Sequence, residues 1–410
     1  MKTKVYIFNG RCRGAQYGIG TYIGELRSAL ERNGIDYGFV NVYATGSTAT
    51  MTEESGHCHI NIPAVPDMTR MDLYSRNVAY LLHEFIQEEK DVKLIFHLNF
   101  MTDPMLVRAL KKSFRHCKVV LVAHYTNWSF DLMGDQARLA EILTKPTRKL
   151  TASDKVIRNG FKADVKMIQK VDRFVCIAWH TLEPYLEYGK VDPKKCQVIY
   201  NGLADEYLPK GKDYKELIRA KYHIGMDEQL ILFVGRLDAV KGLQFLIQSF
   251  RSVMKTHDKA RLVLIGDGYY NSWLGYASDC WTKVTFTGRL RREQVKEFYH
   301  IADVGVVCSL HEEFGLVAIE MMMHRLPVVV SNAGGLDEII EDNVSGLKVP
   351  VVSADGQRVI ETSKLAESIY RLLDDRAFAE TIARHGRKRY QECFSSTVFS
   401  GKMVELYKSL

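Results

Sequence analysis

Two glutamates stand where a strand-like run gives way to a helix-like one. Glu312 and Glu320 have seven residues between them and follow the apolar run Val304–Cys308 and a polar turn. Gly315 is expected at or near the start of the helix, where free backbone amides point toward anions such as a diphosphate. Glu320 would lie about one to two turns inside the helix and could accept both hydroxyls of a ribose, while Glu312 could reach the sugar ring of the same ligand. A solvated pair of glutamates flanking an amphipathic helix is the alternative interpretation.

A second segment carries two cations in a short loop. The apolar run Leu230–Val234 is followed by Gly235, which allows a tight backbone turn, and then by Arg236 and Lys241. Two cations in a loop that precedes a helix can clamp a diphosphate and stabilise it as it leaves. Ordinary surface charges on a solvated loop are the alternative here.

The elements that must position these loops recur along the whole chain. Apolar, β-branched runs occur at residues 4–8, 37–42, 93–97, 118–123, 173–177 and 197–200, and again at 229–234, 261–265, 283–287, 304–307 and 327–330. The runs are mostly continuous rather than alternating, which is typical of strands buried on both faces of a sheet. The segments between them, such as Gly20–Asn33 and Gly242–Lys255, can form amphipathic helices. This rhythm predicts an α/β fold with parallel, doubly wound sheets.

The length of the chain favours two domains. Its 410 residues are too many for one ordinary core and suit two domains of about 200 residues. The strand–helix rhythm pauses in a polar stretch at residues 201–212 and then restarts. We therefore predict an N-terminal Rossmann-like domain over residues 1–205 and a C-terminal one over residues 206–396, and expect the last helix, residues 397–410, to pack back on the first.

Several motifs occur in an order that resembles family 4 glycosyltransferases. They are G-R-x-x-x-x-K-G at 235–242, G-x-G at 266–268, Phe-Thr-Gly at 286–288, Ala-Asp at 302–303, the two glutamates, Pro-Val-Val at 327–329 and Gly-Gly at 334–335. The resemblance implies the GT-B architecture, in which two Rossmann-like parallel-sheet domains face a central cleft. It also implies a retaining transfer of a sugar from a nucleoside diphosphate sugar to an acceptor hydroxyl, as in bacterial glycan or glycolipid biosynthesis.

The resemblance also assigns roles to residues of the second domain. Arg236 and Lys241 match the diphosphate clamp, Glu320 matches the ribose-binding glutamate, and Glu312 matches the glutamate beside the donor sugar. Backbone contacts to phosphate and sugar are expected from Phe314, Gly315, Leu316 and Val317, and contacts to the nucleotide base from Gly288, Arg289 and Leu290. With His124 of the first domain, Arg236, Lys241 and Glu312 are the predicted catalytic residues.

The first domain resembles the family more weakly. Gly18 and Gly20 lie in a segment similar to the family's glycine loop, ahead of a helix-like stretch. His124, directly after the run 118–123, resembles the histidine that hydrogen-bonds the donor sugar, and His97 is the competing candidate. For either residue, a satisfied structural histidine is the alternative. Residues 45–71 are expected to form a long loop on the acceptor side.

Some positions depart from the family pattern. They are Tyr17 in a usual glycine pair, after a loop with Arg11 and Arg13; Cys308-Ser309 in place of proline-serine; Met321 in place of alanine; and His324-Arg325-Leu326 before the Pro-Val-Val motif. None of them removes a charge that the chemistry needs. The sugar specificity of other members is therefore not carried over to this chain.

The positive charge of the chain is concentrated in one segment. The net charge is +7, and residues 145–173 hold nine Lys or Arg and three Asp, a net charge of +6. Because this segment falls in the predicted acceptor domain, it could meet an anionic acceptor or the surface of an anionic membrane. A solvated basic helix and linker is the alternative.

Other features narrow the class of protein. The N-terminal apolar run is too short for a secretory signal, and no run approaches a membrane span, so a cytoplasmic protein is expected, peripheral to the inner face of a membrane at most. The cysteines are scattered and no D-x-D motif occurs, so we expect a metal-independent enzyme with no cofactor, using a nucleotide sugar as donor, with UDP favoured over GDP. Nucleic acid is not an expected partner, since no aromatics cluster within basic strands. Another GT-B enzyme, such as a sugar-nucleotide epimerase or a phosphorylase, and a non-catalytic basic binding protein are the alternatives.

Overall fold

The chain folds into two compact units. The computed structural model describes residues 2–10, 18–66, 69–101, 104–354 and 357–410, so Arg11, Arg13 and Tyr17 lie outside the described residues. Unit 1 consists of Met1–Gly202 and Ser396–Leu410, and unit 2 of Leu203–Ser395. The predicted division was placed after residue 205, three residues beyond the last residue of the first segment of unit 1.

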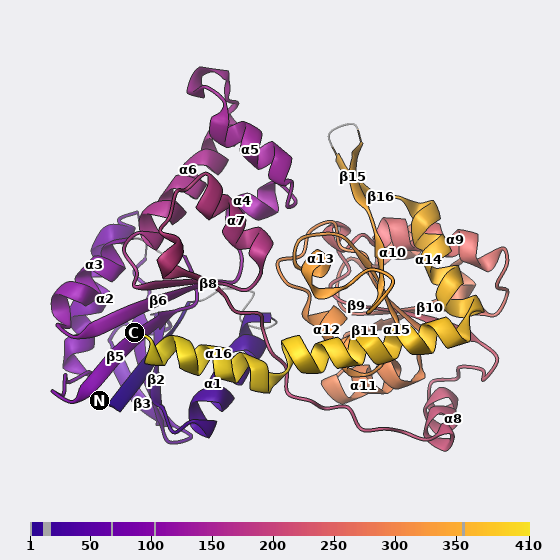
Figure 1. The fold of residues 1–410 in the computed structure, drawn as a ribbon, viewed down its shortest axis with the longest axis horizontal. Helices are drawn as coiled ribbons and strands as arrows, with labels where there is room; N and C mark the ends of the chain where they lie inside the picture. Colours follow the sequence, from indigo (N-terminus) through magenta and orange to yellow (C-terminus); the bar gives the residue numbers. More distant parts are fainter. Residues whose placement is uncertain (1, 11–17, 67–68, 102–103, 355–356) are drawn as a thin grey trace. The chain divides into compact units, whose positions relative to one another are not determined.

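Unit 1 is built on an eight-stranded sheet in the order β3-β4-β2-β1-β5-β6-β7-β8 (Figure 1). Neighbouring strands are parallel except for β3 and β4. The strands are β1 (Lys2–Asn9), β2 (Asp36–Ala44), β3 (Thr50–Glu54), β4 (His57–Pro63), β5 (Val92–Leu98), β6 (Cys117–Ala123), β7 (Arg173–Cys176) and β8 (Cys196–Val198). In β6 the residues Val119–Val122 are fully buried, which explains why this strand reads as a continuous apolar run.

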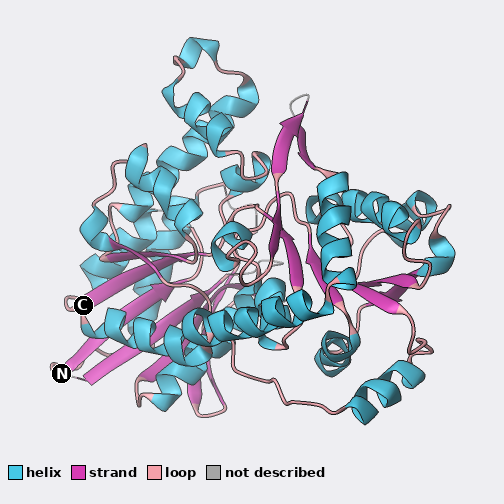
Figure 2. Ribbon diagram, turned by 45° about the vertical axis from the view of Figure 1, so that its right-hand side comes forward, coloured by secondary structure: helices cyan, strands magenta, loops and turns pink. Residues whose placement is uncertain are grey.

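Helices cover both faces of this sheet (Figure 2). They are α1 (Gly18–Arg32), α2 (Met71–Leu81), α3 (Pro104–Ser113), α4 (Asn127–Asp131), α5 (Gln136–Thr144), α6 (Ala152–Ile168), α7 (Trp179–Glu187) and α16 (Ser396–Lys408). The C-terminal helix α16 packs on α1, where the rings of Phe399 and Tyr22 meet edge to face at 5.4 Å and Arg32 donates a 2.7 Å hydrogen bond to Ser396.

Two expectations for unit 1 were wrong. Residues 45–71 are not one long loop, because β3 and β4 form an antiparallel hairpin within them. The turn at Ser55 and Gly56 has φ values of 53° and 78°, as a two-residue hairpin turn of the I′ type requires, and the exposed β3 has no apolar run that would have revealed it. In addition, Gly18 and Gly20 do not form a loop, since α1 begins at Gly18 and both glycines lie in its first turn.

Unit 2 contains a six-stranded, all-parallel sheet in the order β11-β10-β9-β12-β13-β14. Its strands are β9 (Gln229–Val234), β10 (Ala260–Ile265), β11 (Val284–Gly288), β12 (Val304–Val307), β13 (Val328–Ser331) and β14 (Leu347–Val349), with a separate antiparallel ribbon, β15 (Val351–Ala354) and β16 (Gln357–Ile360). The helices are α8 (Lys212–Lys221), α9 (Leu243–Met254), α10 (Tyr270–Tyr276), α11 (Arg292–Ile301), α12 (Leu316–Met323), α13 (Gly335–Ile339), α14 (Thr362–Asp374) and α15 (Arg376–Arg389).

The predicted fold class is confirmed, and the topology marks where each unit can bind a ligand. Each strand-like run of the sequence overlaps an observed strand, and the two parallel-sheet units correspond to the GT-B fold. In unit 2, β9 lies between β10 and β12; in unit 1, β1 lies between β2 and β5. The strand order reverses at these points, and open parallel sheets bind ligands outside the carboxyl ends of the strands there. The loops after β9 and β12 in unit 2, and the loop after β5 in unit 1, therefore flank the two candidate sites.

Candidate functional site

The loops after β9 and β12 of unit 2 are held tightly against each other. The amide of Leu310 donates a 2.7 Å hydrogen bond to the carbonyl oxygen of Val240. Gly242 has a φ of 71°, and a Cβ atom at this position would lie 1.9 Å from the carbonyl oxygen of Cys308. The Cys308 thiol also donates to the Lys241 carbonyl at 3.4 Å. The G-R-x-x-x-x-K-G motif thus requires its last glycine because the β12 loop leaves no room for a side chain.

This close packing brings Lys241 and Glu312 together. The Lys241 Nζ atom lies 2.6 Å from Glu312 Oε2, and the Ser309 hydroxyl donates to the same oxygen at 2.9 Å. Both charged side chains are 20% exposed, so the pair is only partly open to solvent. Burial alone would raise the pKa of Glu312, but the Lys241 charge and the two hydrogen bonds outweigh it and lower that pKa. Glu312 is therefore an ionised carboxylate with a cation already beside it.

The second predicted cation is paired differently. Arg236 follows β9, and its Nη2 atom lies 3.1 Å from Asp238 Oδ2. Its side chain is 56% exposed, far more than that of Lys241. Asp238 also caps the short 3₁₀ turn η5 (Ala239–Lys241), by accepting from the amide of Lys241. Asp238, which the sequence analysis did not single out, therefore fixes both the loop and the resting position of the guanidinium.

Helix α12 begins at Leu316, and Phe314 and Gly315 connect it to Glu312 and Glu313. Gly315 is its N-cap residue, with a φ of 117°, and a Cβ atom there would lie 2.6 Å from a methyl group of Leu336. Phe314 is buried, and Leu316 and Val317 form the first turn of the helix, whose amides lack partners within the helix itself. The expected helix start is therefore confirmed, and the amides that could bind an anion belong to the segment that the sequence singled out.

Glu320 lies on α12 and is held by a residue that sequence reasoning missed. The hydroxyl of Tyr299, on α11, donates to Glu320 Oε2 at 2.7 Å. Burial raises the pKa of Glu320, and this hydrogen bond lowers it in part. Only the placement of α11 beside α12 makes this contact, so no local pattern could have revealed it. Of the base-contacting candidates, Gly288 ends β11 with a φ of 76° and Arg289 and Leu290 follow it; their role stays a prediction.

A buried polar network in unit 1 connects both candidate histidines. The Nε2 atoms of His97 and His124 lie 3.1 and 3.2 Å from the Oδ1 atom of Asn99. The Asn99 amide nitrogen donates to the Phe8 carbonyl, which turns Oδ1 toward the two imidazoles. Because a carbonyl oxygen can only accept, both Nε2 atoms carry the proton. The Tyr407 hydroxyl, 2.7 Å from His97 Nδ1, must then be the donor of that bond.

Both imidazoles in this network are neutral at physiological pH. Burial lowers the pKa of His97 to about 4, against a small opposing effect of Asn99. Burial and the nearby His97 lower the pKa of His124 to about 3. His124 follows β6 as expected and is 8% exposed, while His97 lies within β5 and is fully buried. The geometry favours His124 as the histidine that a ligand can reach, with its Nδ1 atom as the acceptor.

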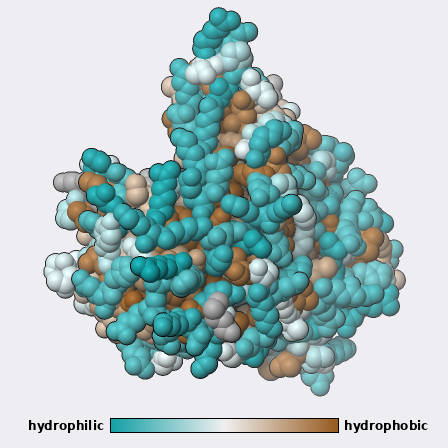
Figure 3. Space-filling view, turned by 60° about the vertical axis from the view of Figure 1, so that its left-hand side comes forward, coloured by the Kyte–Doolittle hydropathy of each residue, from teal (hydrophilic) through white to brown (hydrophobic). Residues whose placement is uncertain are grey.

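The basic segment 145–173 is partly structural. Arg158 is buried and donates to the carbonyl oxygens of Ile142 and Lys145. Among the residues that the structure describes, six exposed cations of the segment form no ion pair, namely Arg148, Lys149, Lys155, Lys162, Lys166 and Lys170. The tip of the projection formed by α5 and α6, at the top of Figure 3, is hydrophilic on the face shown. Contact with an anionic acceptor or membrane through this segment stays a prediction.

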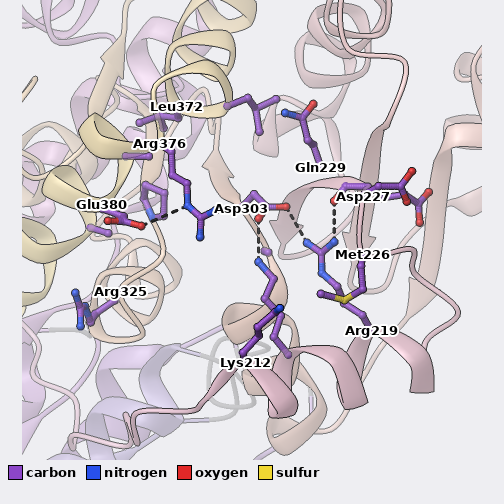
Figure 4. Close-up of a pocket in the computed structure, with 17 residues that line it drawn as sticks. Lys212, Arg219, Met226, Asp227, Gln229, Asp303, Arg325, Leu372, Arg376 and Glu380 are labelled. Atoms are coloured by element: carbon purple, nitrogen blue, oxygen red, sulfur yellow. Dashed lines mark hydrogen bonds and ion pairs between the residues drawn. The ribbon is translucent and has the colours of Figure 1, made fainter.

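Unit 2 also contains a cavity of about 500 Å³, at the amino ends of its strands rather than at their carboxyl ends (Figure 4). It is lined by Gln229 and Asp303, which stand at the amino ends of β9 and β12. Its buried charges are already neutralised, since Asp303 pairs with Arg219 at 2.8 Å and with Lys215 at 3.0 Å. We therefore regard this cavity as part of the scaffold and place the functional site at the carboxyl edge.

Residues 2–10, 18–66, 69–101, 104–354 and 357–410 contain no group of three or more His, Cys, Asp or Glu side chains that could hold a metal ion. Within the same ranges, no helix is both long and apolar enough to cross a membrane.

Comparison with known proteins places the chain among sugar transferases. The family described as glycosyltransferase family 4 matches residues 17–207, and the family described as glycosyl transferases group 1 matches residues 214–389. An uncharacterized glycosyltransferase of Methanocaldococcus jannaschii is 30% identical over 302 residues, which cover 70% of this chain and 75% of that protein.

Solved structures share the fold over the full length. Sucrose-phosphate synthase from Thermosynechococcus elongatus is 20% identical with a TM-score of 0.73, over 100% of this chain and 99% of that one. The Anabaena protein HepE, in complex with UDP and glucose, is 16% identical with a TM-score of 0.70, over 99% and 100% of the two chains. The motifs, the topology and these matches agree: the chain is a GT-B glycosyltransferase and belongs to glycosyltransferase family 4.

Proposed function

We propose that this glycosyltransferase moves a sugar from a nucleoside diphosphate sugar to an acceptor hydroxyl with retention of the anomeric configuration. The observation that carries the proposal is the Lys241–Glu312 pair, 2.6 Å apart at the switch point of the unit 2 sheet, with Glu312 three residues ahead of Gly315, the N-cap residue of α12. A cation and free helix amides suit a diphosphate. A carboxylate at the same place suits the hydroxyls of the attached sugar.

Donor binding would exchange the partners of both cations. The diphosphate would take the place of Glu312 beside Lys241, and that of Asp238 beside Arg236. Glu312 would then be free to accept hydrogen bonds from sugar hydroxyls. Because the charges of the chain itself offset those of the diphosphate, we propose that the reaction needs no metal ion. Glu320, held by Tyr299, would accept the two ribose hydroxyls.

The transfer breaks the bond between the anomeric carbon and the diphosphate oxygen and forms a bond from that carbon to the acceptor oxygen. The departing phosphate oxygen takes the proton of the acceptor hydroxyl on the same face of the sugar, which gives retention. Lys241, Arg236 and the amides of α12 stabilise the negative charge that develops on the diphosphate. His124, neutral and with no described residue bonded to its Nδ1 atom, is proposed to hold a hydroxyl of the donor sugar.

The nucleotide is proposed to be UDP. HepE, which shares the fold, has been solved in complexes with UDP and with UDP-glucose. That likeness concerns the fold alone, so the base must be tested with this chain. An epimerase on the same fold would convert one nucleotide sugar into another and release no free nucleotide, which separates that alternative in an assay of nucleotide release.

The test is nucleotide release from UDP-, GDP- and ADP-sugars in EDTA, without acceptor. We expect the wild type to hydrolyse one class of donor slowly, and Glu320→Ala to lose most of this release because the ribose contacts vanish. Glu367→Ala, an exposed glutamate of α14 in the same unit, is the matched control and should release nucleotide like the wild type. If no nucleotide is released and none binds, the transferase proposal is wrong, and a basic binding protein is the better interpretation.

A further inference from the structure

Unit 1 contains a small cavity at the carboxyl ends of β5 and β6. It measures about 220 Å³, and Asn99 and His124 of the buried network form part of its wall. Helices α4 and α6 close it from the other side, through Trp128 and through Val156 and Gly160. Its volume lies below the range of about 300–1,000 Å³ typical of sites for drug-sized ligands, so it suits a smaller ligand, such as one sugar ring.

The charged groups of this cavity are all negative among the lining residues that the structure describes. Asp131 and Asp164 contribute carboxylates, and no described Lys or Arg lines the cavity. The exposed cations of segment 145–173 do not reach it, although Val156 and Gly160 belong to the same helix as Lys155 and Lys162. The cavity and the basic surface of α6 therefore present opposite charges.

Asp164 is a fixed acceptor rather than a mobile surface charge. Its Oδ2 atom accepts from Trp128 Nε1 and from the Tyr185 hydroxyl, each at 2.8 Å. No described residue donates to Oδ1, which leaves one oxygen of an oriented carboxylate for a ligand. Burial raises the pKa of Asp164 to about 6, against the two hydrogen bonds that lower it, so the group is charged at neutral pH. Asp131 is exposed and supplies a second acceptor.

We propose that this cavity binds the acceptor of the transfer as an uncharged sugar ring, and that it rejects sugars phosphorylated on that ring. Ionised carboxylates accept strong hydrogen bonds from hydroxyl groups, and the nearby Trp128 and Phe100 offer apolar surface to the C–H face of a ring. The same carboxylates repel a phosphate at close range, which discriminates against phosphorylated acceptors. The inference rests on the proposed transfer and narrows its acceptor class.

The experiment starts from the donor found by acceptor-free nucleotide release. Neutral methyl glycosides and the corresponding sugar 6-phosphates are added separately at millimolar concentrations, and the stimulation of release is measured. We expect at least one neutral glycoside to stimulate release and no sugar phosphate to do so. Asp131→Asn and Asp164→Asn should lower the stimulated rate about tenfold or more, because each loses a charge-assisted hydrogen bond, while acceptor-free release stays at the wild-type level.

Two controls keep the outcomes separate. Asp91→Asn, an exposed aspartate of unit 1 away from the cavity, should behave like the wild type. Because Asp164 is buried and its replacement could unfold unit 1, Asp131→Asn carries the test if Asp164→Asn does not fold. Stimulation by a sugar phosphate, silence of all neutral glycosides, or an unchanged stimulated rate in Asp131→Asn would overturn the inference. Absence of acceptor-free release would instead count against the proposed function itself.

Discussion

The strand order reverses once in each of the two sheets, but the side chains at the carboxyl ends of the strands there differ in charge. In unit 2 the edge holds ion pairs, Lys241 with Glu312 and Arg236 with Asp238. In unit 1 the strand ends hold a neutral network, in which His97 and His124 share Asn99 as acceptor, and the charged residues described around the adjoining cavity are the aspartates Asp131 and Asp164. The parallel sheet fixes only where the loops meet. The residues at the ends of the strands decide whether that place suits an anion or an uncharged group.

The difference has an energetic reason. A partly buried cation is tolerated only with a counter-charge, and a ligand anion can replace the internal carboxylate at little extra cost in desolvation. A neutral network has no such exchange to make, and its hydrogen bonds instead fix the orientation and protonation of each group. The ion pairs of unit 2 therefore suit an anionic ligand, and the neutral network of unit 1 suits the positioning of hydroxyl groups.

The largest effect is expected when the ion pair of unit 2 is removed. Lys241→Ala should lower kcat for nucleotide release by about 10²–10³, because the diphosphate loses a partner in a partly buried site and Glu312 loses its counter-charge. Steady-state kinetics with the active donor measure this loss. Lys255→Ala, at the exposed end of α9, controls for the loss of a lysine in the same unit. A fall of less than tenfold in kcat for Lys241→Ala would show that the ion pair is structural.

The second prediction concerns the neutral side and its response to acid. His97 and His124 have pKa values of about 4 and about 3 in the folded protein, below the ordinary value of 6.5. Between pH 6.5 and these lower pKa values the unfolded chain binds more protons than the folded one. The contribution of the two neutral imidazoles to the free energy of unfolding is therefore fully present above about pH 6.5 and is lost as the pH falls. From pH 7 to pH 5 we expect a loss of about 2 kcal/mol for each imidazole.

Hydrogen exchange of the β5 and β6 amides, corrected for intrinsic rates, measures this loss within unit 1 alone. His124→Gln should remove about half of the pH dependence contributed by the two histidines, so its protection factors at pH 5 should fall less below those at pH 7 than the wild-type ones do. An identical pH dependence in the variant and the wild type would mean that His124 is already protonated in the folded state, or solvated in a way that the structure does not show.

Much of this fold could be predicted because buried parallel strands leave continuous apolar runs. Such a run marked β6 and β9, and the G-R-x-x-x-x-K-G motif after β9 marked the loop that follows it. The β3–β4 hairpin escaped because β3 is exposed and polar throughout, so its strand character depends on pairing with β4 rather than on burial. The start of α1 was displaced for a related reason, since glycines predict a loop whenever local sequence alone is considered.

The residues of the candidate site also fall into two groups, those that the sequence could reveal and those that it could not. Charged residues near helix starts could be singled out from their types and spacing, as Lys241, Glu312 and Glu320 were. Their supports could not, because Tyr299 and Asn99 come from other elements and meet their partners only in the folded chain. Ser309 was visible three residues before Glu312, a spacing at which a hydroxyl reaches a following carboxylate, and that signal could have been used.

The smallest expected effect tests whether the C-terminal helix tunes the neutral network. Tyr407 of α16 donates to His97 Nδ1, and this bond holds the proton of His97 on Nε2 and hence the geometry of Asn99 and His124. Tyr407→Phe keeps the buried ring and removes only the hydroxyl, so we expect a three- to tenfold fall in kcat, about 1 kcal/mol, with an unchanged KM for the donor. Tyr80→Phe, at a half-exposed tyrosine of α2, is the control.

Imidazole ¹⁵N chemical shifts distinguish this relay from simple loosening of α16. In the wild type both rings should be protonated on Nε2 alone, whereas Tyr407→Phe should leave His97 as a mixture of tautomers and broaden the signal of His124. If kcat falls while both tautomers stay as in the wild type, the hydroxyl acts only through the packing of α16 on α1. The network of His97, Asn99 and His124 would then keep its geometry without the Tyr407 hydroxyl, and unit 1 would differ from unit 2 at this place by charge alone.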